Sequence, residues 1–559
     1  MEMDYDFDLG PWSRKITTGS ADAQLWFDRG LNWIYAYNHE EAVTCFRRAL
    51  AHDPNCAMAW WGIAYASGPF YNRPWIRFTD TEIAEALPIC HDAAKTALAL
   101  ADGANGADVA NEAERAMIKA TGQRYIAPGE TDRERLGEWH RDFTEAMREA
   151  HLAHPEDLDI SALFAEAAVT CTPRQLWNIR TGEPNPHSLA QEAVTVLETG
   201  LSRIRKTGRP HPGILHMYIH ALEMSPFPDR ALWVADMLRG YAPDAGHLEH
   251  MPAHIYVLCG DYAQSVEQSR RAVAADDKYF AHAGAKNFYT TARCHDLHLY
   301  MYAAMMAGQY RPAMYAAERI QAIATPQLVS SSAPFMASIL DGYSAMRTHV
   351  LVRFGRWHDL IGDAPPDAPD KTPIRAAMHS YGQAIAHAAL GEVSSAEASR
   401  AAFLEALAQI PETAVFLSNT VRDVLAVGEA MIDGELAYRK SEFEAGFKAL
   451  RLAVSRDDAL NYTEPWAWMH PPRHALGALL AEQGRFEEAE TVYRSDLGLD
   501  DKLARCCQHP DNVWAWQGLV ECVERNGDNH EAGLLRQRLK FAMARADVEI
   551  TASCCCRTL

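Results

Sequence analysis

Three short segments of the chain carry histidines at spacings that place side chains on one face of a helix. The segments are HMYIHALE, GHLEHMPAH and CHDLH, which begin at residues 216, 246 and 294. Within each segment the polar residues are three, four or seven positions apart, so each set lies on a single helical face. The side chains concerned are His216, His220, Glu223, His247, His250, His254, His295 and His298.

Seven imidazoles and one carboxylate that converge on one surface have the composition of a metal centre. Packed helices lie about 8–10 Å apart and metal–nitrogen bonds are ~2.0–2.1 Å long, so neighbouring helices can share one or two ions. The alternative interpretation starts from the 24 histidines of the chain. Some clustering is then expected, and a histidine-lined face could simply bind a peptide carboxylate.

Ligand sets rich in imidazole suit copper, zinc or iron rather than magnesium or calcium. Copper is favoured, with iron as the alternative, because soft sulfur ligands are dense nearby, although the same methionines could be ordinary core residues. These methionines are Met217, Met224, Met251, Met301, Met305 and Met306.

The main functional hypothesis is a metal-dependent oxidoreductase that activates dioxygen against a small organic substrate. The seven histidines would hold the metal, with His247 either a ligand or a partner of one. Glu223 would act in catalysis, either by orienting a ligating histidine or as a general base. One alternative is a zinc hydrolase built from the same residues. Another is a non-enzymatic repeat scaffold that binds a partner peptide.

Helical hairpins must position these side chains. Residues 23 to 54 read AQLWFDRGLNWIYAYNHEEAVTCFRRALAHDP, with small and aromatic residues at repeat-like intervals. This unit resembles the tetratricopeptide repeat, a helical hairpin of about 34 residues. Similar units begin near residues 57, 212, 246, 294, 377, 427, 470 and 513, so the resemblance covers roughly two thirds of the chain.

The resemblance implies a register for the histidines. Gly260, Gly308 and Gly484 mark the turns of the hairpins, and Ala231, Ala313 and Ala489 mark their crossings. In this register the histidines occupy the first helices of successive repeats, on the side that faces the concave groove where such repeats bind ligands.

The histidine motifs also resemble a group of microbial tetratricopeptide-repeat proteins. That group shares an HxxxHxxE helix, a GHxxHMPxHI helix, an HxLH helix and a cysteine-rich C-terminus, all of which this chain has. The eight positions named above are the ones that match. The resemblance implies a metal site at these positions and implies no particular reaction.

The predicted fold class is all-α, a tetratricopeptide-type solenoid of helical hairpins that forms a single superhelix or ring. The predicted segments are an N-terminal extension (1–22), N-terminal repeats (23–99), an irregular helical region (100–211), histidine-rich repeats (212–324), an irregular connector (325–376), C-terminal repeats (377–545) and a cysteine-rich tail (546–559).

Several other features are open to two interpretations. Pro252 either bends the helix that carries His250 and His254 or starts it. The tail cysteines, Cys554, Cys555 and Cys556, form a metal-capturing arm, supply an extra ligand by folding back, or belong to a disordered end. Glu166 is a ligand, a base or a solvated charge, and Cys294 lies beside His295 in the sequence.

Three loops could also line a site. These are residues 65–75 with Tyr71, Asn72 and Trp75, residues 172–186 with Trp177, and residues 462–474 with His470 and His474. We expect the second of these to be a surface connector rather than a lid.

The charge of the chain excludes some classes of partner. A formal net charge of −21 and a pI of about 5.6 disfavour nucleic acid, whose phosphates need a basic face. No apolar run is long enough for a membrane span, and the acidic start MEMDYDFDLGPW is not a secretory signal. No glycine-rich phosphate loop is present, so no nucleotide site is expected. We therefore expect a cytoplasmic protein with a small-molecule substrate, no nucleic-acid partner, and repeat surfaces open to a protein partner.

Overall fold

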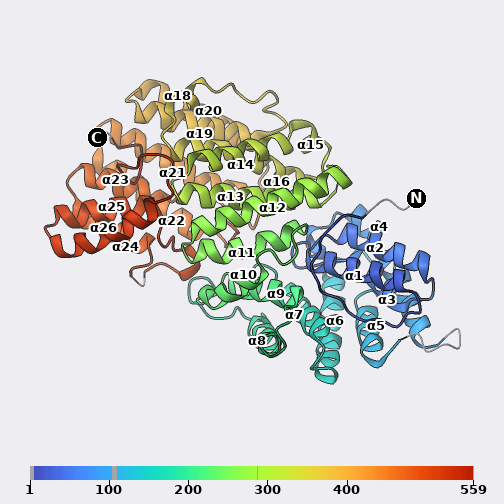
Figure 1. Cartoon of the computed structure of the whole chain (residues 1–559). Coiled ribbons are helices and arrows are strands. Elements are labelled where there is room, and N and C mark those ends of the chain that lie inside the picture. Colours follow the sequence, from blue (N-terminus) through green and yellow to red (C-terminus); the bar gives the residue numbers. More distant parts are fainter. Residues whose placement is uncertain (1–4, 104–109, 286, 501, 558–559) are drawn as a thin grey trace. The chain divides into compact units, whose positions relative to one another are not determined.

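The structure is a computed structural model that describes residues 5–103, 110–285, 287–500 and 502–557. Its described part consists almost entirely of helices (Figure 1), which confirms the predicted all-α class. The strands that it contains, β1 (Val415–Phe416) and β2 (Asn419–Thr420), pair in a short antiparallel hairpin. Among the described helices, none combines the length and apolar character that a membrane crossing requires.

The chain forms two compact units, and each is described by itself. The first contains residues 1–255 and 271–289, and the second contains residues 256–270 and 290–559. The division runs within three helices, α11 (Gly246–Leu258), α12 (Tyr262–Ala283) and α13 (Tyr289–Met306). The predicted seven segments are a finer division and stay a prediction, as does the predicted superhelix or ring.

The first unit is built from consecutive helices that pack against each other in pairs, such as α1 with α2 and α3 with α4. Its other elements are α1 (Ala21–Tyr35), α2 (His39–His52), α3 (Ala57–Ala66), η1 (Trp75–Arg77), α4 (Asp80–Ala101), α5 (Glu112–Gln123), α6 (Arg133–Ala153), α7 (Leu158–Thr170), α8 (Ala190–Thr207), α9 (Pro212–Leu222), η2 (Pro228–Ala231) and α10 (Leu232–Leu238).

The second unit repeats this plan, with α19 against α20, α21 against α22, and α25 against α26. Its remaining elements are α14 (Tyr310–Ile323), α15 (Pro326–Ser331), α16 (Pro334–Ser344), α17 (Met346–Arg353), α18 (Trp357–Gly362), α19 (Pro373–Ala389), α20 (Val393–Gln409), α21 (Val421–Arg439), α22 (Phe443–Ala459), α23 (Pro472–Glu482), α24 (Phe486–Asp496), η3 (Arg505–Cys507), α25 (Val513–Arg525) and α26 (Asn529–Met543). Residues 325–376, predicted as an irregular connector, therefore carry four short helices before α19.

Glycines allow three successive helices to close on one aromatic ring. Phe46 of α2 lies between Gly30 of α1 and Gly62 of α3, and a Cβ at either glycine would come within 2.6 Å of its ring. Tyr493 of α24 lies in the same way between Gly477 and Gly518. Both units therefore pack an aromatic ring between glycines of the two neighbouring helices, which shows that their repeats pack in the same way.

The predicted hairpin turns are confirmed by backbone conformation. Gly260, Gly308 and Gly484 follow the ends of α11, α13 and α23, with φ of +81°, +69° and +73°. This left-handed conformation is the usual way to end a helix, and glycine adopts it without steric cost. The glycines used to place the histidines within the repeats therefore do lie at turns that end helices.

Candidate metal centre

Two helices of the first unit carry most of the predicted ligands. α9 presents His216 and His220, and Glu223 follows as its C-terminal cap. α11 presents the other three histidines of this unit, His247, His250 and His254. All six side chains are at most 3% exposed. The prediction that these side chains face an open groove is wrong, because they are enclosed by protein.

Pro252 lies inside α11, which is one helix from Gly246 to Leu258. The interpretation in which Pro252 starts the helix is therefore wrong. His247, His250 and His254 share one continuous helix. Pro252, which lies between the last two, lacks the backbone N–H that would donate to the Leu248 carbonyl.

His216, His220 and His247 form a group whose ring nitrogens converge. One nitrogen from each ring lies within 4.8 Å of the others. The Nε2 atoms of His216 and His247 are 3.1 Å apart. Bonds of ~2.0–2.1 Å to one tetrahedral ion would place two ligand nitrogens about 3.3 Å apart. The spacing of these imidazoles is therefore close to that of a metal site.

The opposite nitrogens of two of these rings are held by fixed acceptors. His216 Nδ1 lies 2.7 Å from the carbonyl oxygen of Tyr35, and His220 Nδ1 lies 2.7 Å from Glu223 Oε1. A carbonyl or carboxylate only accepts, so each Nδ1 carries the proton and donates it. Each Nε2 then keeps its lone pair, which is the tautomer that binds metal through Nε2. Among the described residues, no hydrogen-bond partner occupies His220 Nε2.

Glu223 connects this group to the other two histidines of the unit. Its Oε2 lies 2.5 Å from His254 Nδ1, and His254 Nε2 lies 2.6 Å from His250 Nε2. Arg174 Nη1 lies 3.7 Å from Glu223 Oε1. Since both carboxylate oxygens accept from imidazoles, the geometry favours an orienting role for Glu223 over that of a general base.

Burial keeps these imidazoles in the form that binds metal. It lowers the pKa of His216 to about 3, against the opposing hydrogen bond to the Tyr35 carbonyl. It also lowers the pKa of His220 far below its usual range, and the neighbouring His216 adds to that effect. Both side chains are therefore neutral near pH 7, and neutral imidazole is the form that ligates metals.

An aromatic side chain that the sequence did not indicate covers the group. The ring of Tyr37 lies 4.5 Å from that of His216 and is nearly parallel to the rings of His220 and His247, at 5.9 and 5.2 Å. Its hydroxyl donates to Met217 Sδ at 3.4 Å. Met217 is therefore engaged by a phenol, and this contact does not add to the case for a soft sulfur ligand.

Two of the predicted loops contribute to the surroundings of the centre. Tyr71 from the loop 65–75 lies 4.8 Å from the ring of His220. In the loop 172–186, Arg174 lies over Tyr71 and approaches Glu223, and Trp177 Nε1 donates to the Ala221 carbonyl at 2.8 Å. The loop lies largely at the surface, as expected of a connector, and its buried Trp177 anchors it on α9.

His295 and His298 lie on α13 in the second unit. His298 is fully buried and packs against Tyr343 and Phe416 at 5.3 and 5.9 Å. Within the described part of the chain, neither of its ring nitrogens has a hydrogen-bond partner. Burial lowers the pKa of His298 to about 3. The convergence of these two histidines with the five of the first unit stays a prediction.

Other predicted residues have local partners. Glu166 accepts a hydrogen bond from Tyr65, and burial raises the pKa of its carboxyl group. Its interpretation as a solvated charge is wrong, since it is 5% exposed. Cys294 is fully buried in the second unit.

His470 and His474 belong to buried networks of the second unit. His470 lies 3.1 Å from His349 and 3.2 Å from the Tyr381 hydroxyl. His474 pairs with Asp496 at 2.9 Å and with Arg353 at 2.8 Å. The cavity that both line measures about 20 Å³, enough for about one water molecule. The predicted aromatic pocket is thus nearly filled.

The C-terminal tail is ordered as far as the structure describes it, so the interpretation as a disordered end is wrong. Ser553 is buried; its hydroxyl donates to the His474 carbonyl at 2.8 Å and its own carbonyl accepts from Arg353. Cys554 and Cys556 form a disulfide, so neither is a free thiolate ligand. The tail does fold back, onto helices of the second unit.

The comparisons with known proteins give one family match. A family model described as tetratricopeptide repeat matches residues 23–56. No curated protein matches the chain. The solved structures that are similar to it include the following two. The crystal structure of the APC/C hetero-tetramer Cut9–Hcn1 has 10% identity over 95% of this chain and 78% of that chain, with a TM-score of 0.31. Yeast Tom70 has 11% identity over 93% of this chain and 91% of that chain, with a TM-score of 0.25.

The tetratricopeptide match coincides with a packing pattern that recurs in the chain. The match spans α1 and α2, the hairpin whose Phe46 is enclosed by Gly30 and Gly62. The same glycine-lined packing recurs around Tyr493. The chain therefore contains a tetratricopeptide repeat at residues 23–56, within a fold of packed helical hairpins.

Proposed function

We propose that the first unit binds a first-row transition metal ion through His216, His220 and His247. The observation that carries this proposal is the orientation of the buried imidazoles. Fixed acceptors hold the Nδ1 protons of His216 and His220, and one nitrogen of each of these rings lies within 4.8 Å of a nitrogen of His247. A histidine that merely fills a core has no need of this arrangement, whereas a ligand does.

The residues around the group would position and shield a metal. Glu223 holds the rings of His220 and His254 by its two oxygens, and Arg174 lies close to the same carboxylate. Tyr37 covers the rings of the three histidines and excludes water from that side. These contacts fix the ligand atoms before a metal arrives, which reduces the entropic cost of binding.

An all-imidazole ligand set suits copper, iron or zinc, and copper or iron would supply redox chemistry when bound. We propose on this basis an oxidoreductase that acts on a small organic substrate. Zinc in the same ligands would instead supply a Lewis acid for hydrolysis.

Metal content tests the proposal directly. The protein would be purified from cultures supplemented with copper, iron or zinc, and its metal measured by mass spectrometry. We expect stoichiometric metal in the parent and at least about tenfold less in a His216→Ala/His220→Ala double variant that stays folded by circular dichroism. The exposed His358 offers a matched control, since His358→Ala should keep the full metal content.

The result identifies the chemistry to pursue. Copper or iron would justify an oxygen-consumption screen with small organic substrates, and zinc alone would favour hydrolysis. Metal at background in the parent from all three cultures would overturn the proposal.

A second candidate function rests on the repeat match at residues 23–56. Repeats of this kind commonly bind peptides of partner proteins, and a protein-binding scaffold requires no metal. In that case the double variant would leave the metal content at background, as in the parent. A partner protein would be retained by the immobilised parent and by the folded variant with equal yield.

A further inference from the structure

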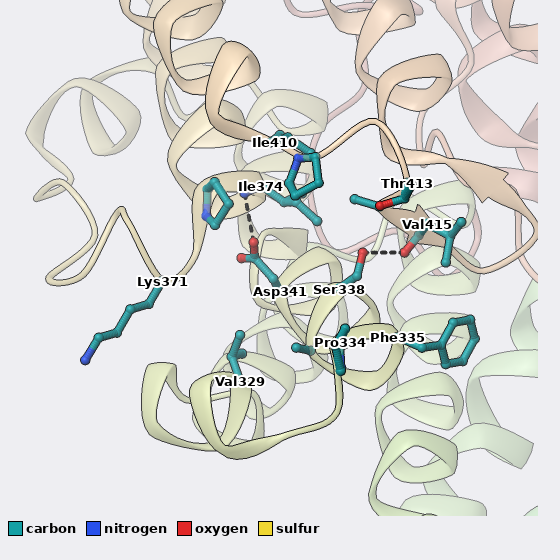
Figure 2. A pocket seen from close by; sticks show the side chains of 14 residues that line it. Val329, Pro334, Phe335, Ser338, Asp341, Lys371, Ile374, Ile410, Thr413 and Val415 are labelled. Carbon is teal, nitrogen blue, oxygen red and sulfur yellow. Dashed lines mark hydrogen bonds between the residues drawn. The ribbon is translucent and has the colours of Figure 1, made fainter. Parts of the chain in front are cut away.

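The second unit contains a cavity that the proposed metal centre does not use. It has a volume of about 320 Å³ and lies between α15, α16, the start of α19 and the β-hairpin (Figure 2). Pockets that bind small molecules usually measure about 300–1,000 Å³. Most of its lining is apolar and includes Val329, Phe335, Ile374, Ile410, Pro411 and Val415.

One carboxylate lies inside this apolar lining. Asp341 of α16 is 3% exposed, yet it lines the cavity. Its oxygens accept from the backbone N–H groups of Ile374, at 2.8 Å, and Arg375, at 3.2 Å, both in the first turn of α19. The hydroxyl of Ser344 lies 3.4 Å from Oδ1. These donors hold the carboxylate in a fixed position at the wall of the cavity (Figure 2).

The Arg375 guanidinium acts on Asp341 only from beyond ion-pair distance, and it lowers the pKa of the carboxyl less than the backbone donors do. Within the described residues, no lysine, arginine or histidine forms an ion pair with it, and all of its hydrogen-bond donors are neutral groups. Burial raises the pKa of Asp341 to about 7, against the opposing hydrogen bonds from Ile374 and Arg375. An ionised carboxylate in this position is therefore short of compensating charge.

The other polar residues of the cavity do not compete for this role. Ser338 donates to the Val415 carbonyl at 2.6 Å, so its hydroxyl hydrogen is already used. Lys371 is exposed, and Figure 2 shows its chain extending away from Asp341. A ligand that enters the cavity thus meets mostly apolar walls, the neutral side chain of Thr413 and one carboxyl group.

We propose that this cavity binds a small hydrophobic amine, with its ammonium group on Asp341 and its hydrocarbon part between Ile374, Ile410 and Val415. An ammonium supplies both the missing positive charge and hydrogen-bond donors, whereas an alcohol supplies only a donor and a carboxylate repels. The net charge of −21 favours the approach of a cation over that of an anion.

Calorimetric titration of the full-length protein would test this site. The probes are two amines, phenethylamine and hexylamine. The control compounds for phenethylamine are 2-phenylethanol, which is neutral, and 3-phenylpropionate, which is an anion. We expect saturable binding of at least one amine, at least about tenfold tighter than either control compound. No binding of either amine, or equal binding of the alcohol or the acid, would overturn the proposal.

Single substitutions test whether the amine binds beside Asp341. Asp341→Asn keeps one acceptor oxygen for the start of α19 and should weaken amine binding at least about tenfold. Asp370→Asn makes the same chemical change at an exposed position near the cavity and should leave binding unchanged.

A second variant covers the case in which Asp341→Asn does not fold. Ala337 lines the cavity and is only partly buried, so Ala337→Phe should fill the space without disturbing the core. It should abolish amine binding while thermal stability is kept. Unchanged amine binding in this variant would contradict the proposed place of binding. The metal content of the first unit is a separate readout, so failure of either proposal leaves the other intact.

Discussion

Glu223 shows how one buried carboxylate can determine the tautomer of two imidazoles. Both of its oxygens accept from Nδ1 atoms, of His220 at 2.7 Å and of His254 at 2.5 Å. The carboxylate therefore leaves the Nε2 atoms of both rings without a proton. Orienting partners of this kind typically contribute 10–100-fold to metal affinity.

The variant Glu223→Gln tests that role. An amide offers one acceptor oxygen and one donor nitrogen, so one of the two imidazoles must rotate or change tautomer. We expect metal affinity to fall by roughly 10–100-fold, measured by competition with a chelator. The exposed Glu183 provides the matched control, since Glu183→Gln should bind metal like the parent. Equal affinities in both variants would show that Glu223 does not orient the ligands.

The stability of the protein should depend on pH through Glu435 of α21. Burial raises its pKa to about 7 from the usual 4.5, against the opposing effect of Arg439 and with a smaller push from Glu482. The folded state therefore binds this proton more tightly than the unfolded chain. The stability contributed by this group is fully present below about pH 4.5 and is lost as the pH rises towards 7.

Glu435→Gln removes the titrating group and should flatten this dependence. We expect the variant to gain up to roughly 3 kcal/mol of unfolding free energy relative to the parent at pH 8, and little at pH 4.5. Urea unfolding of both proteins between these pH values measures the difference. The same change at the exposed Glu412 should alter stability equally at all pH values. A gain for Glu435→Gln that is independent of pH would contradict the explanation.

At the scale of helices, repeat packing depends on the absence of a side chain at particular positions. A Cβ at Gly62 would lie 2.6 Å from three atoms of the Phe46 ring, and both residues are enclosed by α1, α2 and α3. Alanine favours a helix over glycine by roughly 0.5–1 kcal/mol. Overpacking a close contact costs about 1–3 kcal/mol, so the contact outweighs the propensity.

Gly62→Ala should therefore destabilise the protein, by roughly 1–2 kcal/mol in chemical unfolding. Gly137→Ala in α6 is the control, because a Cβ there would meet only the Arg141 side chain at 3.7 Å. That change should be neutral or stabilising. A Phe46→Leu change should relieve part of the penalty in the Gly62→Ala background, which a double-mutant cycle measures.

At the scale of the whole molecule, the C-terminal tail joins distant helices of the second unit. Arg353 of α17 donates to the Ser553 carbonyl, and the Ser553 hydroxyl lies 2.5 Å from that of Tyr493. Arg557 pairs with both carboxylate oxygens of Glu521 at 2.6 and 2.8 Å. The tail is thus a part of the fold of this unit.

Truncation after Thr551 should destabilise the second unit by a few kcal/mol, on the order of 2–4, because buried Arg353 loses an acceptor and the cavity beneath the tail opens. Thermal unfolding and limited proteolysis measure this effect. Metal content should stay at the parent level, since the proposed ligands are in the first unit. A truncated protein as stable as the parent would show that the tail contributes nothing to folding.

The helices, their turns and the faces that the histidines share could all be predicted from the spacing of residues along the chain. These are local properties, set by spacings of three and four residues and by glycines such as Gly260 and Gly308 in the left-handed conformation. The interpretations of Pro252, of the loop 172–186 and of the tail needed the tertiary structure, since each depends on what packs against the segment.

The tertiary structure also decided which nitrogen of each imidazole faces inward. The acceptor for His216 is the carbonyl of Tyr35, 181 residues away in the sequence. Tyr37 and Arg174 reach the centre from a turn and a loop, where no periodic pattern marks them. The cavity around Asp341 is likewise assembled from helix ends and a hairpin that lie apart in the chain. Spacing along one helix determines which histidines lie on the same face. The residues that orient and cover those histidines come from distant segments, so only the tertiary packing brings them together.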